Sequence, residues 1–263
     1  MEITFFKYQG AGNDFIIIDD RAEHFDRSNT DLVAKMCDRR FGIGADGLML
    51  LRSKEGFDFE MIYYNADGHE GSMCGNGGRC IVAFAKNIGL VGDKCRFVAV
   101  DGPHEAEMLD QNEKKWVSLK MIDVPNIEKG LGYVFMDTGS PHYVSFNSNN
   151  LDNMDLIEEA RKVRYNERYS KDGINVNFID INENILKIRT YERGVEDETL
   201  ACGTGVTAAV LTAHITGNIK GNAIEVKAKG GTLKVLFERV GNGYENIWLQ
   251  GPAEFVFKGL IND

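Results

Sequence analysis

The chain has 263 residues, enough for one large domain or two of ordinary size. Its composition is that of a soluble globular protein, and its formal net charge of −10 argues against nucleic acid or an anionic membrane as the main partner. No stretch approaches the ~20 apolar residues of a membrane helix, and the start of the chain, MEITFFKYQG, does not resemble a secretory signal. We therefore expect a cytoplasmic protein with no membrane partner.

The cysteines indicate neither a disulfide scaffold nor a metal site. There are 5 of them, an odd number, and no two form a CxxC pair. We expect no bound metal and a reducing compartment.

The predicted elements are mostly strands. In chain order, the first half has predicted strands at 3–8, 14–19, 46–51, 57–65, 95–100, 104–109 and 116–121, with helices at 30–39 and 76–88. The second half has predicted strands at 142–146, 175–181, 185–192, 223–228, 232–237, 246–250 and 254–257, with helices at 153–163 and 204–216. Thr30 or Asp31 is the expected N-cap of the first helix.

The helices at 76–88 and 204–216 are apolar on almost every side and rich in Ala, which predicts that both are buried. Gly89 and Gly217 are placed to end them. We expect each half of the chain to wrap a curved, mostly antiparallel sheet around such a helix.

The chain contains an internal repeat. The segment 201-ACGTGVTAAVLTAHITG-217 resembles 73-MCGNGGRCIVAFAKNIG-89, with Cys74 and Cys202 128 residues apart. Other glycine and tyrosine pairs recur at offsets of 127 to 129. The expected fold is α+β, with two pseudo-symmetric lobes over 1–125 and 126–263.

Both repeated cysteines directly precede a predicted helix. The start of a helix offers N–H groups and partial positive charge, which favour a thiolate, while the neighbouring glycines let a carboxylate approach the backbone. Two such sites facing each other would suit a cofactor-free racemase or epimerase, in which one thiolate removes a Cα proton and the opposite thiol returns one.

Several of these features also have a simpler interpretation. A lone cysteine before a helix is usually a small buried residue, but here the duplication retains it in both halves. Cys37, Cys80 and Cys95 have no counterpart and are expected to be ordinary buried thiols. The segment 42-GIGADG-47 has dinucleotide-site spacing but follows a helix, so we interpret it as a glycine-rich turn.

Motifs along the whole chain resemble the diaminopimelate epimerase family. They are GAGNDF, GIGADG, YYNADG, MCGNGGRC, YERGV and TLACGTG. The resemblance implies an isomerase that needs neither pyridoxal phosphate nor metal, and that converts LL-2,6-diaminopimelate to the meso isomer for lysine and peptidoglycan synthesis. It also implies a cytoplasmic homodimer of two similar lobes, in which the last strand, about 253–260, packs with the N-terminal lobe.

The resemblance also assigns roles to residues. Cys74 and Cys202 would be the acid/base pair, and His142 and Glu192 would tune the thiols and hold the amine. The reacting carboxylate would be bound by the backbone of Gly75, Asn76, Gly203 and Thr204. The distal end of the substrate would be read by Asn13, Asn65, Asn175 and Arg193. The chain departs from the family pattern at Gly47, where many members have Gln, and at Ser140, where many have Asn.

Two alternatives remain at this point. Proline and hydroxyproline racemases resemble the chain in using two cysteines, but their first motif reads MCGHG; Asn76 and Arg193 favour diaminopimelate. A dithiol redox or binding protein would not need the distal set of polar residues. The sequence leaves open which cysteine acts on which stereoisomer.

Overall fold

The computed structural model describes residues 2–111, 114–147, 151–182 and 185–262. The chain forms two compact units, Met1–Leu119 with Gly251–Asp263, and Lys120–Gln250. The last segment of the chain therefore belongs to the first unit, and the first crossing between the units lies a few residues before the expected boundary at 125.

The first unit is a sheet of eight described strands with two helices. In spatial order the strands are β17 (Glu254–Asn262), β1 (Glu2–Gly10), β2 (Asn13–Asp19), β3 (Gly47–Arg52), β4 (Phe59–Asn65), β5 (Lys94–Ala99), β6 (Gly102–Gln111) and β7 (Lys114–Lys120). The β2–β3 and β4–β5 pairs are parallel and the others are antiparallel. The helices are α1 (Thr30–Cys37) and α2 (Gly75–Asn87).

The second unit has the same strand pairing. Its main strands, in spatial order, are β8 (Ile127–Lys129), β9 (Tyr133–Asp137), β10 (Pro141–Phe146), β11 (Asn175–Asn182), β12 (Ile185–Glu192), β14 (Ala223–Ala228), β15 (Gly231–Val240) and β16 (Gly243–Pro252). A short strand, β13 (Asp197–Thr199), pairs with β12. The helices are η1 (Leu151–Asn153), α3 (Leu156–Arg164) and α4 (Gly203–Ile215).

The two units repeat each other in register as well as in order. The parallel pair β2–β3 aligns Phe15 with Gly47, and the parallel pair β10–β11 aligns His142 with Asn175. In each unit a helix follows the first strand of this pair and a second helix follows the β3–β4 or β11–β12 hairpin. The expected fold class, a mostly antiparallel sheet around a central helix in each half, is confirmed.

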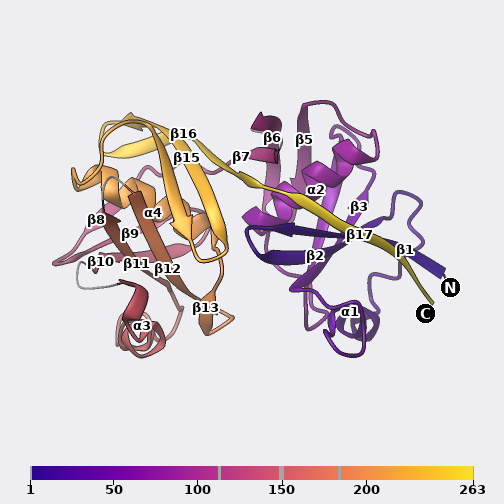
Figure 1. The fold of residues 1–263 in the computed structure, drawn as a ribbon, viewed down its shortest axis with the longest axis horizontal. Coiled ribbons are helices and arrows are strands. Elements are labelled where there is room, and N and C mark those ends of the chain that lie inside the picture. The colour runs from indigo at the N-terminus through magenta and orange to yellow at the C-terminus, as the bar shows by residue number, and fades with distance from the viewer. Residues whose placement is uncertain (1, 112–113, 148–150, 183–184, 263) are drawn as a thin grey trace. The chain divides into compact units, whose positions relative to one another are not determined.

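The central helices are buried, as their composition predicts. In α2 every residue from Gly75 to Ala85 is buried, and in α4 ten of thirteen residues are. Figure 1 shows each helix among the strands of its own unit. In the first unit, the Phe84 ring of α2 lies 4.8 Å from that of Phe6 and 6.0 Å from that of Tyr8 on β1. Buried aromatic side chains of this kind stabilise a fold by about 1.5–3 kcal/mol each.

Several expected boundaries are wrong, for local reasons. The N-cap of α1 is Asn29, whose side chain accepts a hydrogen bond from the Leu32 N–H at 3.0 Å, and not Thr30 or Asp31. The same helix ends at Cys37, because the Asp38 carboxylate accepts bonds from the next backbone N–H groups and forms a turn. The third helix begins at Leu156, capped by Asp155, after a separate 3-10 turn. Three strands, β8, β9 and β13, were not predicted at all.

None of the helices in the described part of the chain combines the length and the apolar character that crossing a lipid bilayer requires.

Candidate active site

Cys74 and Cys202 occupy the same structural position in the two units. Each is the N-cap residue of a buried helix, with extended backbone dihedrals of φ −104°, ψ 124° and φ −110°, ψ 113°. Their carbonyl groups accept the first helical hydrogen bonds, from Gly78 at 2.7 Å and Val206 at 2.8 Å. Their side chains do not cap the helix, so each sulfur is left beside the first-turn N–H groups of its helix.

In the first unit a directed chain of hydrogen bonds runs past Cys74. The Arg79 guanidinium donates to Asn76 Oδ1 at 2.9 Å, and Asn76 Nδ2 donates to Asn13 Oδ1 at 3.2 Å. Asn13 Nδ2 in turn donates to Asp46 Oδ2 at 2.6 Å. Arginine can only donate and an ionised carboxylate can only accept, so both amides between them have a fixed orientation. This leaves Asn13 Oδ1 facing Cys74, with a Sγ to Oδ1 distance of 3.6 Å.

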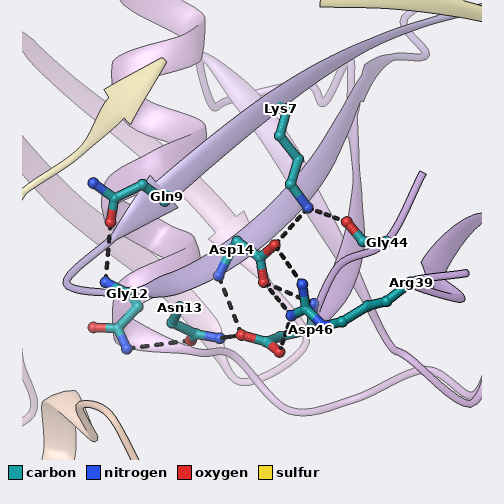
Figure 2. A network of polar contacts seen from close by, with 9 residues as sticks. Lys7, Gln9, Gly12, Asn13, Asp14, Arg39, Gly44 and Asp46 are labelled. Atoms are coloured by element: carbon teal, nitrogen blue, oxygen red, sulfur yellow. Dashed lines mark hydrogen bonds and ion pairs between the residues drawn. The ribbon is translucent and has the colours of Figure 1, made fainter. Parts of the chain in front are cut away.

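The acceptor end of this chain is held by a cluster of charges, which Figure 2 shows around Asp14 and Asp46. Arg39 donates to both carboxyl oxygens of Asp14, at 3.0 and 2.6 Å, and to Asp46 at 2.7 Å. Lys7 lies 2.7 Å from Asp14 and also donates to the Gly44 carbonyl. Burial alone would raise the pKa of Asp14, but the bonds from Arg39 and Lys7 outweigh it and lower that pKa to about 2.

In the second unit hydroxyl groups surround the cysteine. Cys202 Sγ lies 3.4 Å from Thr204 Oγ1, which lies 2.9 Å from His142 Nε2. The Ser140 hydroxyl is also in reach, 3.0 Å from His142 Nε2 and 3.2 Å from Thr204 Oγ1. The Thr204 backbone is fixed by a bond of 2.9 Å from the Thr138 hydroxyl to its carbonyl.

The geometry determines the tautomer of His142. Asn177 Nδ2 lies 3.0 Å from His142 Nδ1 and donates to the Tyr143 carbonyl at 3.0 Å, while its Oδ1 accepts from the Thr190 hydroxyl at 2.9 Å. A carbonyl oxygen can only accept, so the amide nitrogen faces the ring and Nδ1 must be the acceptor. The imidazole hydrogen therefore lies on Nε2 and is donated toward Thr204 or Ser140.

His142 is also held in the neutral state. It is completely buried, and burial, with a contribution from the charge of Arg193, lowers its pKa to about 3. A neutral imidazole at this position is a hydrogen-bond donor to the hydroxyl groups next to Cys202, and it is not a cation at neutral pH.

Asn175 joins the expected distal residues to the same network. Its Nδ2 donates to Ser140 Oγ and to the Pro141 carbonyl, both at 3.1 Å, and its Oδ1 accepts from the Arg193 N–H at 2.9 Å. The Arg193 side chain is exposed and donates to the Asp172 carbonyl at 3.0 Å. Ser140, a departure from the family pattern, is thus bonded to three neighbouring side chains of this unit.

Asn65 and Glu192 lie at equivalent strand ends. Asn65 ends β4 and is exposed, and Glu192 ends β12 and is half-buried. Gly47 faces Asn65 across the β3–β4 pair. An added Cβ at Gly47 would lie 2.5 Å from the Tyr63 ring and 2.6 Å from the Tyr64 carbonyl oxygen, so a glutamine fits here only if both the Tyr63 side chain and the Tyr64 backbone move.

Apart from Asn65 and Glu192, which lie at strand ends, the expected site residues form two groups. The structure brings Asn13 and Asn76 to Cys74, and brings Ser140, His142, Asn175, Thr204 and the Arg193 backbone into one network with Cys202. Sequence reasoning missed four residues that orient these groups: Asp46, Arg79, Asn177 and Thr190. Asp46 and Arg79 are charged residues inside the motifs GIGADG and MCGNGGRC and could have been singled out there. Asn177 and Thr190 stand in ordinary strand patterns, which give no such signal.

The structure also has a hollow away from the cysteines. A hollow of about 680 Å³ in the second unit is lined by Gly217, Ile219 and Thr232, at the end of α4 opposite to Cys202. Within the described residues, no three or more His, Cys, Asp or Glu side chains are grouped as a metal site would require.

The chain matches one family model twice. The model is described as diaminopimelate epimerase, and the matches cover residues 5–126 and 134–256. A diaminopimelate epimerase from Flavobacterium psychrophilum is 49% identical over 257 residues, which are 97% of this chain and 99% of that protein. One from Chlorobaculum tepidum is 46% identical, with 96% and 98% covered, and one from Aquifex aeolicus is 37% identical, with 99% and 98% covered.

Solved structures with lower sequence identity have the same fold. A phenazine biosynthesis protein of the PhzF family from Bacillus anthracis superposes with a TM-score of 0.75 at 14% identity, covering all of both chains. A probable proline racemase from Agrobacterium radiobacter gives 0.69 at 14% identity, over 99% of this chain and 92% of that one. These likenesses concern the fold alone. The full-length relatives and the two matches to the family model show that this chain belongs to the diaminopimelate epimerase family.

Proposed function

We propose that the protein converts LL-2,6-diaminopimelate to meso-diaminopimelate, with Cys74 and Cys202 as the acid/base pair. The observation that carries the proposal is the position of the two cysteines. Each is the N-cap residue of a buried helix at an equivalent point of its unit, and its side chain makes no capping hydrogen bond. Membership of the family supplies the substrate.

The reaction inverts one carbon by moving two protons. One cysteine, as a thiolate, takes the proton from Cα, and the resulting carbanion takes a proton from the other cysteine on the opposite face. The pair ends with its charge exchanged, so that the free enzyme must return to its starting state before the next turnover. The mechanism requires that both helix starts reach the same substrate in the working enzyme.

The surroundings of each sulfur suit this task. The first-turn N–H groups at Gly75, Asn76, Gly203 and Thr204 would hold the reacting carboxylate, because helix N-termini bind anions. In the second unit, His142 donates from Nε2 and leaves the Thr204 hydroxyl to donate to Cys202, which stabilises the thiolate form of that residue. We assign Glu192 to the amine at the reacting centre.

The second amino-acid group of the substrate needs its own donors and acceptors. We assign this role to Asn13, Asn65, Asn175 and Arg193, of which Asn13 also lies against Cys74. We further propose that the enzyme acts without pyridoxal phosphate or metal, and works as a cytoplasmic homodimer in the synthesis of lysine and peptidoglycan precursors.

Proton exchange in D2O tests the function directly. With LL-diaminopimelate and no added cofactor, NMR should show the meso isomer forming and deuterium entering at one Cα. Proline is the control substrate and should remain undeuterated. Exchange of proline without exchange of diaminopimelate would replace this proposal by a proline racemase.

Single cysteine variants test the two-thiol mechanism. Cys74→Ala and Cys202→Ala should each abolish formation of the meso isomer while the protein stays folded by circular dichroism. An active double variant would end the mechanism. Oxidation that joins Cys74 to Cys202 should also inactivate the enzyme, and full epimerase activity of the oxidised protein would likewise end the mechanism.

A further inference from the structure

Arg79 is a buried charge that the proposed mechanism does not use. Its side chain lies in the first turns of α2 and is 0% exposed. It donates to Asn76 Oδ1 at 2.9 Å, to the Gly75 carbonyl at 3.3 Å and to the Pro252 carbonyl at 3.5 Å. All three acceptors are neutral.

Within the described ranges, none of the ion pairs of the first unit includes Arg79. Burial lowers its pKa, but arginine keeps its proton at any pH at which proteins function. A buried charge without a counter-ion is costly, so a nearby group that becomes negative is strongly favoured.

The other ionisable groups around α2 do not supply that negative charge. Cys80 and Tyr8 stay neutral, since burial raises the pKa of each to about 12. Most of the remaining groups on the packed strands have partners: Asp14 and Asp46 with Arg39, Lys7 with Asp14, Asp19 with Arg21, Arg52 with Asp20, Glu107 with Lys94, His104 with Asp101, and Glu254 with the amide of Gln9. Glu2, Glu105 and Lys258 on the same strands are exposed to solvent.

The group beside Arg79 that can become negative is Cys74. The guanidinium is bonded to the carbonyl of Gly75, the residue that follows Cys74, and through Asn76 to Asn13, whose Oδ1 faces the sulfur. Asn13 Oδ1 accepts a hydrogen bond from the Cys74 thiol and so favours the protonated form of Cys74. The positive charge of Arg79 acts in the opposite direction, together with the helix N-terminus.

The second unit has no such charge at the equivalent place. There Thr207 takes the position of Arg79 in the helix, and its hydroxyl donates to the Gly203 carbonyl at 3.1 Å, as Arg79 does to Gly75. The hydrogen bond from this side chain to the first-turn carbonyl is thus repeated in both halves. The positive charge at this helix position is present only in the first unit, next to Cys74.

We propose that Arg79 is the counter-charge of the Cys74 thiolate, a positioning and electrostatic role that the duplicated site of Cys202 lacks. Its use during turnover rests on the proposed function. Its effect on the thiol does not, because the reactivity of Cys74 can be measured without substrate.

The experiment is alkylation by iodoacetamide across a range of pH, with both cysteines followed by mass spectrometry in the same protein. Arg79→Gln keeps N–H donors for Asn76 and Gly75 but removes the charge. The midpoint of Cys74 alkylation should rise by about one pH unit or more, equivalent to about tenfold slower reaction at neutral pH. The midpoint of Cys202 should not move, which also shows that the protein is folded.

Arg79→Lys is the matched variant, because it keeps the charge and changes the shape. Its Cys74 midpoint should stay near that of the unmodified protein. An unchanged Cys74 midpoint in Arg79→Gln overturns the proposal, as does a rise in Arg79→Lys of the same size, or an equal rise at Cys202. Because no substrate is present, these results stand apart from whether the protein epimerises diaminopimelate.

Discussion

His142 illustrates how a single residue receives its role from its neighbours. The side chain of a histidine on a surface has a pKa near 6.5, and in its neutral form the hydrogen can lie on either ring nitrogen. Here burial keeps the ring neutral, and the amide of Asn177 assigns its hydrogen to Nε2. The residue can therefore donate toward Thr204 over the whole physiological range of pH.

The buried neutral state of His142 should make stability depend on pH. Its pKa is about 3 when folded and near 6.5 when unfolded, so below pH 6.5 the unfolded chain binds the extra proton. Its contribution is fully present above pH 6.5 and is lost as pH falls, by about 1.4 kcal/mol per pH unit, until about pH 3. Urea unfolding between pH 4.5 and 6.5 should show this slope reduced in His142→Gln.

The exposed His24 provides the control for that measurement, since His24→Gln should keep the slope of the unmodified protein. Equal slopes in the unmodified protein and in His142→Gln would show that His142 is not held neutral by folding.

Asn177→Leu should disturb the tautomer of His142. The substitution removes the donor to Nδ1 and leaves the Thr190 hydroxyl without its acceptor, which should cost about 1–3 kcal/mol of stability. Nitrogen NMR of the imidazole should show a mixture of tautomers, and kcat should fall more than KM rises. Thr190→Val, which leaves the bond to Nδ1 intact, should keep the Nε2–H tautomer; loss of that tautomer in both variants, or in neither, would contradict the assignment to Asn177.

The position of both cysteines at the start of a buried helix was predictable from the sequence, and the residues that surround them were not. Cys74 and Cys202 stand out because they are repeated with their glycines. The roles of Arg79 and Asp46 depend on which atoms the fold places within hydrogen-bond distance and on full burial of a guanidinium, neither of which a single sequence expresses.

At the scale of elements, the glycines of the two helix starts have different surroundings. Gly77 and Gly205 are equivalent, each three residues after its cysteine. An added Cβ at Gly205 would lie 2.6 Å from Asn177 Oδ1 and 3.4 Å from Cys202 Sγ. At Gly77 the nearest atoms would be Met49 Sδ at 3.1 Å and Met61 Cε at 3.4 Å, which belong to flexible side chains.

Gly205→Ala should therefore destabilise the protein although alanine is the better helix former. Helix propensity favours alanine by about 1 kcal/mol, but the collision with the amide that holds His142 should cost up to about 3 kcal/mol, which outweighs this gain. Chemical denaturation should show lower stability for Gly205→Ala than for Gly77→Ala, and the loss of activity should be larger. The reverse order would mean that the Asn177 amide is free to move away from the helix.

Element prediction succeeded where the pattern was long. The expected bounds of the buried helices α2 and α4 lie within one residue of the observed ones. A long apolar, alanine-rich run between glycines is compatible with few structures other than a buried helix. The three-residue strands β8 and β13 carry no periodicity, and exist because a neighbouring strand offers free ladder positions. The N-cap of α1 is Asn29 and not Thr30 or Asp31, because the Asn29 side chain accepts the hydrogen bond from the Leu32 N–H.

At the scale of the whole chain, the duplicated pattern explains the place of the C-terminus. In the second unit β8 pairs with the outer side of β9, and in the first unit β17 does the same for β1. The chain thus enters the first unit, leaves it, and returns to supply its last strand, beside the N-terminus in Figure 1. The repeat was readable from the cysteine offset, whereas this return depends on a pairing between the two ends of the chain.

The returning strand has an exposed apolar edge at which the proposed homodimer would form. In the described part of the chain β17 pairs with β1 alone, and Phe255, Val256, Phe257 and Leu260 are 50%, 52%, 43% and 60% exposed. An open edge with several exposed apolar side chains is rare in monomers, since it invites pairing with another chain. A second copy using the same edge would form a symmetric dimer.

Val256→Lys combined with Leu260→Lys should therefore convert the protein to a monomer. Two buried charges at such an interface would each lack a partner, which disfavours association strongly. Sedimentation should give twice the chain mass of 29.4 kDa for the unmodified protein and the single mass for the double variant. Val100, 66% exposed in the turn after β5, provides the matched control, and Val100→Lys should remain dimeric. A double variant that sediments as a dimer would place the interface on another surface, and an unmodified protein that sediments as a monomer would exclude the homodimer itself.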